Sequence, residues 1–315
     1  MKVRFVSKVF FTLFLTCMVV TARSNDVGTL LEQWSSGSRP KIIAAYMPWF
    51  GDPRHIDVGY SSQDPDVIRR QIDEAVSMGI SGFAVDWNGP THSYTDKNFE
   101  IMEKIASEKQ FHVALLYNES DDPGQSTDAT ISSLDRAYKA YFGPDAPYRS
   151  AYMTYNNRPI VFIFPKSGKT DWNLVRQHVN SWAIPPLLVY KEDSPYANVL
   201  DGFYVWVNPG KKGWQANGSA WGKDHLEDFY KRMRDKYPDK LLVAGAWPGF
   251  DDSKASWGLN RHMDTRCGKT LEETLQIAAQ ENSGPNPRPF LLIQTWNDYE
   301  EGTALERRSL DCGKG

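Results

Sequence analysis

The sequence lacks a surplus of positive charge, since its 315 residues include 36 lysines and arginines against 39 aspartates and glutamates. Without a basic stripe to neutralise phosphates, nucleic acid is not an expected partner. The sequence also lacks a glycine-rich phosphate loop, a Gly-x-Ser-x-Gly elbow and a His-Glu-x-x-His helix. These absences argue against nucleotide-dependent, serine-hydrolase and zinc-protease chemistry, so we expect no cofactor.

Long apolar runs are also missing, except for one at the N-terminus. Residues 9–20 are mostly apolar, follow Lys2, Arg4 and Lys8, and precede small residues up to Ala22. This order is typical of a secretory signal peptide, which we predict for residues 1–22. An uncleaved anchor is the alternative, but the run is short for a bilayer span. We therefore expect a secreted or periplasmic mature chain, residues 23–315, without a stable membrane anchor.

Cysteine is scarce, with three in the whole sequence. Cys17 lies within the predicted signal peptide, so only Cys267 and Cys312 would remain in the mature protein. In an oxidising compartment these two could pair, and the bridge would then enclose the acidic segment near the C-terminus. Two free buried thiols are the alternative, and the sequence leaves the choice open.

Eight short apolar segments, mostly separated by helical patterns, run along the chain. The predicted strands cover residues 41–46, 81–87, 111–117, 160–164, 187–190, 202–207, 241–244 and 290–293, with a short extra strand at 152–155. Helices are predicted over residues 64–79, 96–109, 131–142, 171–182, 224–236 and from 270 onward. No internal repeat or long linker divides the chain. This pattern predicts a single-domain α/β fold, a (β/α)8 barrel of the TIM type.

Local signals mark where some helices begin and end. Asp64 before Pro65 is typical of an N-cap followed by a first-turn proline, and Thr270 with Glu273 matches a capping box. After Gly302 too few residues remain for a full eighth helix. We therefore expect the last helix to be short or absent, and an N-terminal helix at residues 26–34 to cover the gap.

An acidic cluster follows the last predicted strand. Asp298, Glu300 and Glu301 lie within four residues, just before Gly302. Carboxylates this close repel one another, so at least one should have a raised pKa if the site is dry. A solvated acidic loop is the alternative. The strand in front favours a catalytic role, because the C-terminal ends of barrel strands carry the chemistry in this fold.

Residues at the C-terminal ends of the other strands should share one face of the barrel. They are mainly aromatic, carboxamide and acidic, a mixture that suits a sugar, because flat rings stack on the C–H faces of pyranosides while polar groups reach the hydroxyls. Core packing is the alternative for each single aromatic residue. The candidate substrate-binding residues are Tyr46, Trp49, His55, Asp86, Trp87, Tyr117, Glu119, Tyr204, Trp206, Asp251, Arg261, Trp296 and Asn297.

Several blocks of sequence carry a resemblance to known enzymes. Together, Tyr46-Met-Pro-Trp-Phe-Gly51, Gly82-Phe-Ala-Val-Asp-Trp-Asn-Gly-Pro90, Pro248-Gly-Phe-Asp-Asp252 and Trp296-Asn-Asp-Tyr-Glu-Glu-Gly-Thr303 resemble glycoside hydrolase family 99, the endo-α-mannosidases and endo-α-mannanases. The run Trp296-Asn-Asp-Tyr299 is closer to family 71, the endo-α-1,3-glucanases. The chain therefore resembles both families.

This resemblance implies an endo-acting α-glycoside hydrolase of α-linked mannan or glucan on a (β/α)8 barrel. It implies that Glu301 protonates the departing glycosidic oxygen, while Asp298 assists attack at the anomeric carbon by deprotonating the neighbouring 2-hydroxyl. Asp298 stands where family 99 has a glutamate, which withdraws the carboxylate by one methylene and leaves retention or inversion open. Glu300 should point away from the substrate.

Two other functions remain open at this point. A non-catalytic carbohydrate-binding protein on the same barrel would bind an α-linked oligosaccharide without releasing product. Metal-assisted hydrolysis through Asp86, Asp251, Asp252 and His55 is conceivable, but nothing in their spacing requires a metal, and none is predicted. We expect a monomer. The sugar and its linkage depend on loop shapes, which the sequence leaves open.

Overall fold

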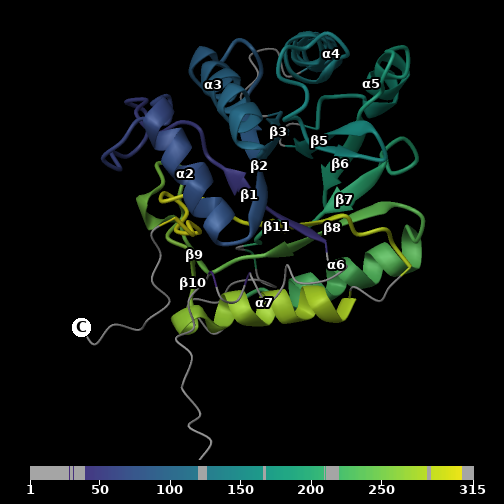
Figure 1. Cartoon of the computed structure of the whole chain (residues 1–315). Helices are drawn as coiled ribbons and strands as arrows, with labels where there is room; N and C mark the ends of the chain where they lie inside the picture. Colours follow the sequence, from purple (N-terminus) through teal and green to yellow (C-terminus); the bar gives the residue numbers. More distant parts are fainter. Residues whose placement is uncertain are drawn as a thin grey trace, which may run out of the picture.

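Eight parallel strands close into a barrel in this computed structural model (Figure 1). They are β1 (Lys41–Tyr46), β2 (Ile80–Trp87), β3 (His112–Asn118), β5 (Arg158–Phe164), β6 (Leu187–Lys191), β7 (Gly202–Tyr204), β8 (Leu241–Ala246) and β11 (Phe290–Ile293). Their order is β3-β2-β1-β11-β8-β7-β6-β5, and the pairing of β3 with β5 closes the ring. The structure describes residues 28, 31, 40–119, 126–165, 168–208, 210, 220–281 and 285–306. The predicted α/β barrel is confirmed.

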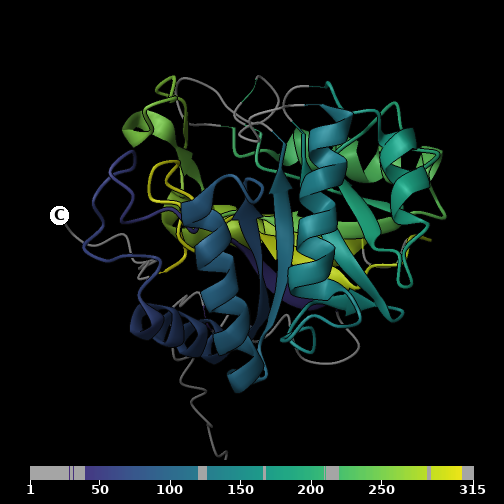
Figure 2. The same cartoon turned by 90° about the horizontal axis from the view of Figure 1, so that it is seen from above.

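Six α-helices surround the strands in these described ranges (Figure 1, Figure 2). They are α2 (Pro65–Ser77), α3 (Ser93–Lys109), α4 (Thr127–Ala137), α5 (Trp172–Val179), α6 (Lys223–Lys236) and α7 (Lys269–Gln280). The Asp64 side chain accepts the backbone N–H of Asp66 and Pro65 stands in the first turn, so the predicted start of α2 is confirmed. Ile68, Ile72 and Ala75 bury its inner face, as the helical spacing requires.

Two smaller features extend the helix and strand pattern between β3 and β5. Helix α4 continues into a π-helical turn, η1 (Tyr138–Phe142), which closes the predicted helix at Phe142. The short strand β4 (Thr154–Tyr155) pairs antiparallel with β5, and the two central residues of the hairpin, Asn156 and Asn157, have φ of 50° and 60°. Asparagine tolerates this left-handed region, so the predicted extra strand and its turn are confirmed.

An excursion after β8 departs from the simple strand–helix alternation. It contains β9 (Phe250–Asp251), the 3-10 turn η2 (Asp252–Lys254), β10 (His262–Met263) and a second 3-10 turn, η3 (Arg266–Gly268). Strands β9 and β10 pair antiparallel beside the barrel. The sequence did not predict these elements, because each is only two or three residues long.

The capping box predicted at Thr270 is wrong. Helix α7 begins at Lys269 after Gly268, which makes no side-chain capping bond. Thr270 therefore lies inside the first turn, and its hydroxyl donates to the Asp264 carbonyl at 2.6 Å. The hydroxyl is used by a turn that precedes the helix, which removes it from the capping role.

The strand predicted at residues 202–207 ends at Tyr204. Beyond Tyr204 the backbone no longer pairs with a neighbouring strand. The Gln294 side chain instead accepts the N–H of Val207 at 2.6 Å and donates to the carbonyl of Val205 at 2.6 Å. A side chain from β11's end thus satisfies backbone groups that a strand pattern would have paired.

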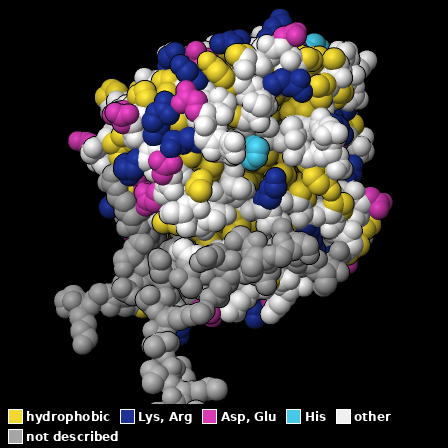
Figure 3. Space-filling model, in the orientation of Figure 1, with side chains coloured by type: hydrophobic (Ala, Val, Ile, Leu, Met, Phe, Trp, Pro, Cys, Tyr) yellow, Lys and Arg dark blue, Asp and Glu magenta, His cyan; other side chains and the backbone are white. Residues whose placement is uncertain are grey.

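Both faces of the barrel strands are covered, and this shapes the core. Every residue of β8 and β11 is buried, as expected for parallel strands with side chains in the barrel on one face and helices on the other. On the outer surface seen in Figure 3, basic and acidic side chains are interspersed. Within the described residues, no helix has the length and apolar character needed to cross a membrane.

The two chain ends are described only in part. The predicted signal peptide and Cys312 lie outside the described residues. Of the predicted helix at 26–34, Gly28 and Leu31 are helical, and Leu31 is fully buried against the core. From Ile293 to Glu306 no helix follows β11, in line with the expected short or absent last helix. Cys267 is disulfide-bonded, so the alternative of two free thiols is wrong.

Candidate active site

A pocket of about 440 Å³ lies at the C-terminal ends of the barrel strands. Polar side chains at strand ends, such as Asp86 and Asn118, meet aromatic walls such as Trp49 and Trp206 there. Its size is that of a small-ligand site. The lining residues are Met47, Trp49, Asp52, Arg54, His55, Asp86, Asn88, His92, Thr95, Asn118, Phe164, Trp206, Ser256, Trp257, Asp298 and Glu301.

Asn297 fixes the acidic segment to the neighbouring strand β1. Its Oδ1 accepts the backbone N–H of Met47 at 2.7 Å, and its Nδ2 donates to the Met47 carbonyl at 2.9 Å. The amide thus pairs with the backbone of Met47 as another peptide group would. Together with the bonds of Gln294 towards Val205 and Val207, this holds both edges of the loop after β11.

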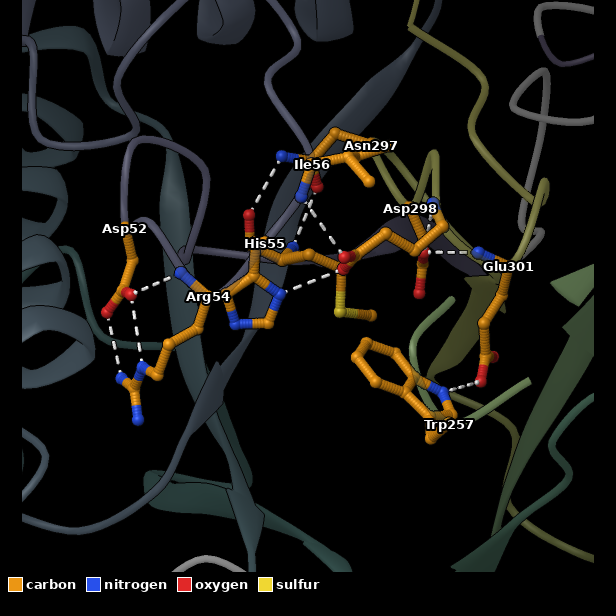
Figure 4. A network of polar contacts seen from close by, with 10 residues as sticks. Asp52, Arg54, His55, Ile56, Trp257, Asn297, Asp298 and Glu301 are labelled. Carbon is orange, nitrogen blue, oxygen red and sulfur yellow. Dashed lines mark hydrogen bonds and ion pairs between the residues drawn. The ribbon is translucent and has the colours of Figure 1, made fainter. Parts of the chain in front are cut away.

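Asp298 is buried and organises the turn of which it is part. Its Oδ1 accepts the backbone N–H groups of Glu300 at 3.0 Å and Glu301 at 2.8 Å, and its own N–H donates to Thr295 Oγ1 at 2.8 Å. This local side-chain to backbone bonding is what aspartate favours in tight turns. The second carboxylate oxygen, Oδ2, is left to face the pocket (Figure 4).

Gly302 lets the chain turn away directly after the last acid. Its φ is +63°, and a Cβ at this position would lie 3.1 Å from backbone atoms of Asp251. Only glycine combines that dihedral angle with such a close approach at little cost. The carbonyl of Glu301 meanwhile accepts the N–H of Asp251 at 2.8 Å, which joins the acidic loop to β9.

Glu301 also lines the pocket and has its own hydrogen-bond donor. Its Oε1 accepts the indole N–H of Trp257 at 3.0 Å (Figure 4). Behind it lies a buried ion pair, in which Arg261 Nη2 is 2.6 Å from Asp252 Oδ2. Asp298 and Glu301 are therefore held by separate sets of donors while they line the same pocket.

Burial controls the protonation of both acids. It raises the pKa of Asp298 well above its usual range, and the negative charge of Glu301 adds to the rise. Burial also raises the pKa of Glu301, against the opposing effects of the Trp257 hydrogen bond and the Arg261 charge. Two carboxyl groups coupled in this way titrate as a pair, which keeps one proton over the range between its two apparent pKa values.

Glu300, the third acid of the cluster, turns away from the pocket. Its Oε2 is 2.9 Å from His55 Nδ1, and its Oε1 accepts the N–H of Ile56 at 3.3 Å. The His55 ring stacks on Trp49 with 4.9 Å between ring centroids, and both rings line the pocket. Glu300 thus holds His55 in place but does not itself line the pocket. The sequence analysis expected it to point away from the substrate.

A comparison with known proteins places this chain in an enzyme family. The model of the family described as Glycosyl hydrolase family 71 matches residues 55–305. The chain belongs to glycosyl hydrolase family 71. The prediction of a glycoside hydrolase of the family 99 and family 71 type is therefore confirmed at the level of the family.

Individual relatives of this family 71 chain are distant. A mouse protein described as "Glycoprotein endo-alpha-1,2-mannosidase-like protein" is 21% identical over 300 residues, which are 85% of this chain and 62% of that protein. The chain thus spans about three fifths of this curated relative's length.

Solved structures give the same architecture. The GH99 endo-alpha-mannosidase from Bacteroides thetaiotaomicron, in complex with BIS-TRIS-Propane, has a TM-score of 0.62 at 17% identity, over 84% of this chain and 86% of that one. A structure described as "Glycoside hydrolase-like protein" has a TM-score of 0.61 at 12% identity, over 85% and 86%. At such identities the likeness establishes the shared fold.

Six predicted site residues of the family 71 chain lie in the pocket wall. Asp298 and Glu301 line it as predicted, and so do the wall residues Trp49, His55, Asp86 and Trp206. Asn88 and Asn118, which directly follow the predicted strands 81–87 and 111–117, line it as well. Asp86 lies in the last two residues of β2, and the other predicted wall residues lie in the loops that follow β1, β7 and β11.

Five aromatic residues predicted for the site belong to the core instead. Each is almost completely buried, and none lines the pocket: Tyr46, Trp87, Tyr117, Tyr204 and Trp296. Trp87 donates its N–H to Asp96 at 3.0 Å, for example, and Tyr204 donates to the Ile163 carbonyl at 3.1 Å. Asn297 is also absent from the wall, because both ends of its amide are bound to Met47.

Three charged residues predicted for the site lie outside the pocket wall. Asp251 caps the turn η2 by accepting the N–H of Ser253 at 3.0 Å, and Arg261 pairs with Asp252 behind Glu301. Glu119 is buried at the end of β3 without lining the pocket. None of the three lines the pocket.

Several wall residues were missed by sequence reasoning. Thr95 lies in the first turn of α3 and Phe164 ends β5, whereas the others lie in loops between the elements: Met47, Asp52, Arg54, His92, Ser256 and Trp257. Asp52 and Arg54 form a bidentate ion pair on the rim, and this pairing lowers the pKa of Asp52 to about 2. Trp257 had one available signal, since it lies shortly after the block Pro248–Asp252, which resembles family 99.

No cluster of three or more histidine, cysteine, aspartate or glutamate side chains with metal-holding geometry occurs among the described residues. The four residues considered for a metal are separated by the fold. Asp86 and His55 line the pocket, whereas Asp252 is paired with Arg261 and Asp251 caps a turn.

Proposed function

We propose that this chain is a secreted, endo-acting α-glycoside hydrolase that cleaves α-linked mannan or glucan with the carboxyl pair Asp298 and Glu301. The observation that carries the proposal is that these two acids reach one pocket while Glu300, between them in sequence, is held by His55. Membership of family 71 supports hydrolysis of a glycosidic bond.

The environment of the pair suits acid and base work on a sugar. Burial raises the pKa of both acids, and two coupled carboxyl groups that share one proton supply both an acid and a base. Glu301 would give its proton to the glycosidic oxygen, which retains the electrons of the broken bond to the anomeric carbon. Asp298 would accept a proton from the attacking hydroxyl, either of a water or of the sugar's own 2-position.

The walls of the pocket support a carbohydrate ligand. Trp49, Trp206 and Trp257 offer flat apolar faces, while Asn88 and Asn118 offer donors and acceptors for hydroxyls. The names of the relatives point to α-mannosides, and the resemblance to family 71 implies α-1,3-glucans. Both substrate classes therefore belong in the first assay.

The experiment is a screen of purified residues 23–315 against α-mannans, α-1,3-glucans and α-1,4-glucans. Release of oligosaccharides from internal bonds, absent in Glu301→Gln, would support the proposal, and an NMR time course would then distinguish retention from inversion. Binding of an α-linked oligosaccharide with no product after long incubation would favour the non-catalytic carbohydrate-binding alternative. Loss of activity with a chelator would indicate metal-assisted hydrolysis.

Secretion and a monomeric state are part of the proposal. The predicted signal peptide and the disulfide of Cys267 both support an oxidising compartment. N-terminal sequencing of the exported protein should find a chain that starts near residue 23, and light scattering should give the mass of a single copy. A membrane-retained protein or a stable dimer would contradict these points.

A further inference from the structure

Trp257 stands at the mouth of the pocket and contacts the proposed acid directly. Its Nε1 lies 3.0 Å from Glu301 Oε1. Its ring meets those of Trp49 and His55 nearly edge-on, at centroid distances of 6.4 Å and 6.1 Å. Figure 4 shows the indole between His55 and Glu301, with its N–H towards the Glu301 carboxylate. A residue that served only as a stacking surface would not need this directed bond.

The turn that presents Trp257 is built around the buried carboxylate of Asp252. That carboxylate accepts the backbone N–H of Leu259 at 3.1 Å and of Arg261 at 2.6 Å, and the Arg261 Nε at 2.7 Å. The segment from 252 to 261 therefore closes on one buried group. Trp257 projects from a fixed turn, although its side chain is partly exposed.

We propose that Trp257 is a positioning residue that selects which oxygen of Glu301 carries the transferable proton. An indole N–H can only donate, so Oε1 must accept it whether Glu301 is neutral or ionised. In a neutral carboxyl group the carbonyl oxygen is the better acceptor, and the proton therefore belongs on Oε2. This inference rests on the proposed role of Glu301 as the acid.

The bond also helps the proton to leave. During cleavage the proton moves from Oε2 to the glycosidic oxygen, which keeps the electron pair of the broken C–O bond. Glu301 becomes a carboxylate, and its bond from Trp257 becomes charge-assisted and stronger. Trp257 thus stabilises the ionised acid and keeps it oriented for the return of a proton.

The other charges around Glu301 remain in place when the indole is replaced. Asp298 lies in the same turn, Asp252 and Arg261 lie behind it, and Lys191 faces it from the end of β6. Asp52, Arg54, His55, Asp86 and His92 complete the charged and titratable groups of the pocket wall. A comparison of the wild type with a variant at Trp257 therefore isolates one hydrogen bond.

The decisive variant is Trp257→Phe, which keeps an aromatic ring and removes the N–H. We expect kcat at the optimum to fall about tenfold, the scale of a hydrogen bond to a charged group. The alkaline limb of the kcat/KM profile should move to higher pH, because the bond that lowers the Glu301 pKa is gone. Leu259→Ala, in the same turn and 72% exposed, is the matched control and should leave kcat and the pH profile unchanged.

A second measurement needs no substrate. Carbon-13 NMR of carboxyl-labelled glutamate, assigned with Glu301→Gln, should report a higher apparent pKa for Glu301 in Trp257→Phe than in the wild type. Unchanged kcat, pH limb and Glu301 pKa in Trp257→Phe would overturn the inference, as would a change in KM alone. If Glu301→Gln is inactive in that case, the proposed function survives, whereas an active Glu301→Gln would remove the acid role itself.

Discussion

Neighbouring residues at the end of one strand have opposite surroundings in this protein. At the end of β2, Asp86 lines the pocket, whereas Trp87 is fully buried and donates its N–H to Asp96 on helix α3. The same contrast recurs at the end of β3, where Asn118 faces the pocket and the Tyr117 hydroxyl bonds to Thr130 on α4. One position along the strand separates a wall residue from a residue of the outer layer.

The reason is the pleat of the strand. Successive side chains point to opposite faces, so in a barrel they point alternately to the axis and to the helices. Tyr46 obeys the same rule at the end of β1, with its hydroxyl bonded to Gln71 on α2 while Met47 lines the pocket. Of two adjacent residues at a strand end, the one on the face towards the barrel axis therefore joins the pocket wall.

The largest expected effect concerns the two acids that face the pocket. Glu301→Gln and Asp298→Asn should each lower kcat by about 10³-fold or more, near the upper range for loss of general acid or base catalysis. Circular dichroism and thermal melts should show that both variants fold. Near wild-type turnover in either variant would contradict the assignment of that residue.

The pair at the end of β2 tests the contrast between the two faces. Trp87→Ala removes a fully buried indole and should destabilise the protein by about 3–5 kcal/mol, with little change in activity per folded molecule. Asp86→Asn should do the reverse, lowering kcat/KM by about tenfold with a small change in melting temperature. Urea unfolding and steady-state kinetics on both variants measure the two effects, and equal behaviour of the two would refute the contrast.

A buried carboxyl away from the pocket, Glu103 on α3, should affect stability instead of turnover. Burial raises its pKa from the ordinary value of 4.5 to about 9. Between these values the folded state holds a proton that the unfolded chain releases, so the unfolding free energy falls as pH rises from about 4.5 towards 9. Glu103→Gln cannot titrate and should flatten this dependence.

Unfolding by urea at several pH values, with the wild type beside Glu103→Gln, measures this difference. The variant should gain most at pH 8 to 9 and little near pH 4.5. Parallel curves for the two proteins would mean that Glu103 does not change its protonation on unfolding.

The smallest effect is expected for Glu300, which is buried beside Asp298 and Glu301 but contacts His55. Glu300→Gln keeps the size of the side chain and one oxygen acceptor, so it loses at most one of the contacts to His55 Nδ1 and to the N–H of Ile56, and kcat should fall by less than about tenfold. Kinetics of this variant next to Glu301→Gln compare two adjacent glutamates. A loss as large as that of Glu301→Gln would show that Glu300 takes part in the chemistry.

Much of the fold could be predicted because its signals are local. The apolar run of β1, the Asp64 cap before Pro65 and the hairpin at Asn156 each depend on a few adjacent residues, and all were predicted correctly. The capping box at Thr270 failed because a carbonyl outside the helix, that of Asp264 in the preceding turn, accepts the hydroxyl's hydrogen bond. A cap or turn can be predicted from a few adjacent residues only where no group outside that element binds the same side chain.

The candidate site could be predicted only in part, for a similar reason. The acids Asp298 and Glu301 follow an apolar strand, and this order alone placed them at the edge of the barrel. Trp257 lies in an excursion without a recognisable pattern, and its bond to Glu301 joins residues 44 positions apart. No sequence pattern predicts a contact between these two residues.

The amino-acid order of this chain was sufficient for the barrel, its strand sequence and the acidic turn, because periodicity and turn chemistry act over a few neighbouring residues. The folded barrel was needed to choose Asp86 over Trp87 and to bring Trp257 to Glu301. Those choices depend on which face of each strand turns towards the barrel axis and on how loops from separate strands meet over one pocket. Both are decided only when all eight strands have closed.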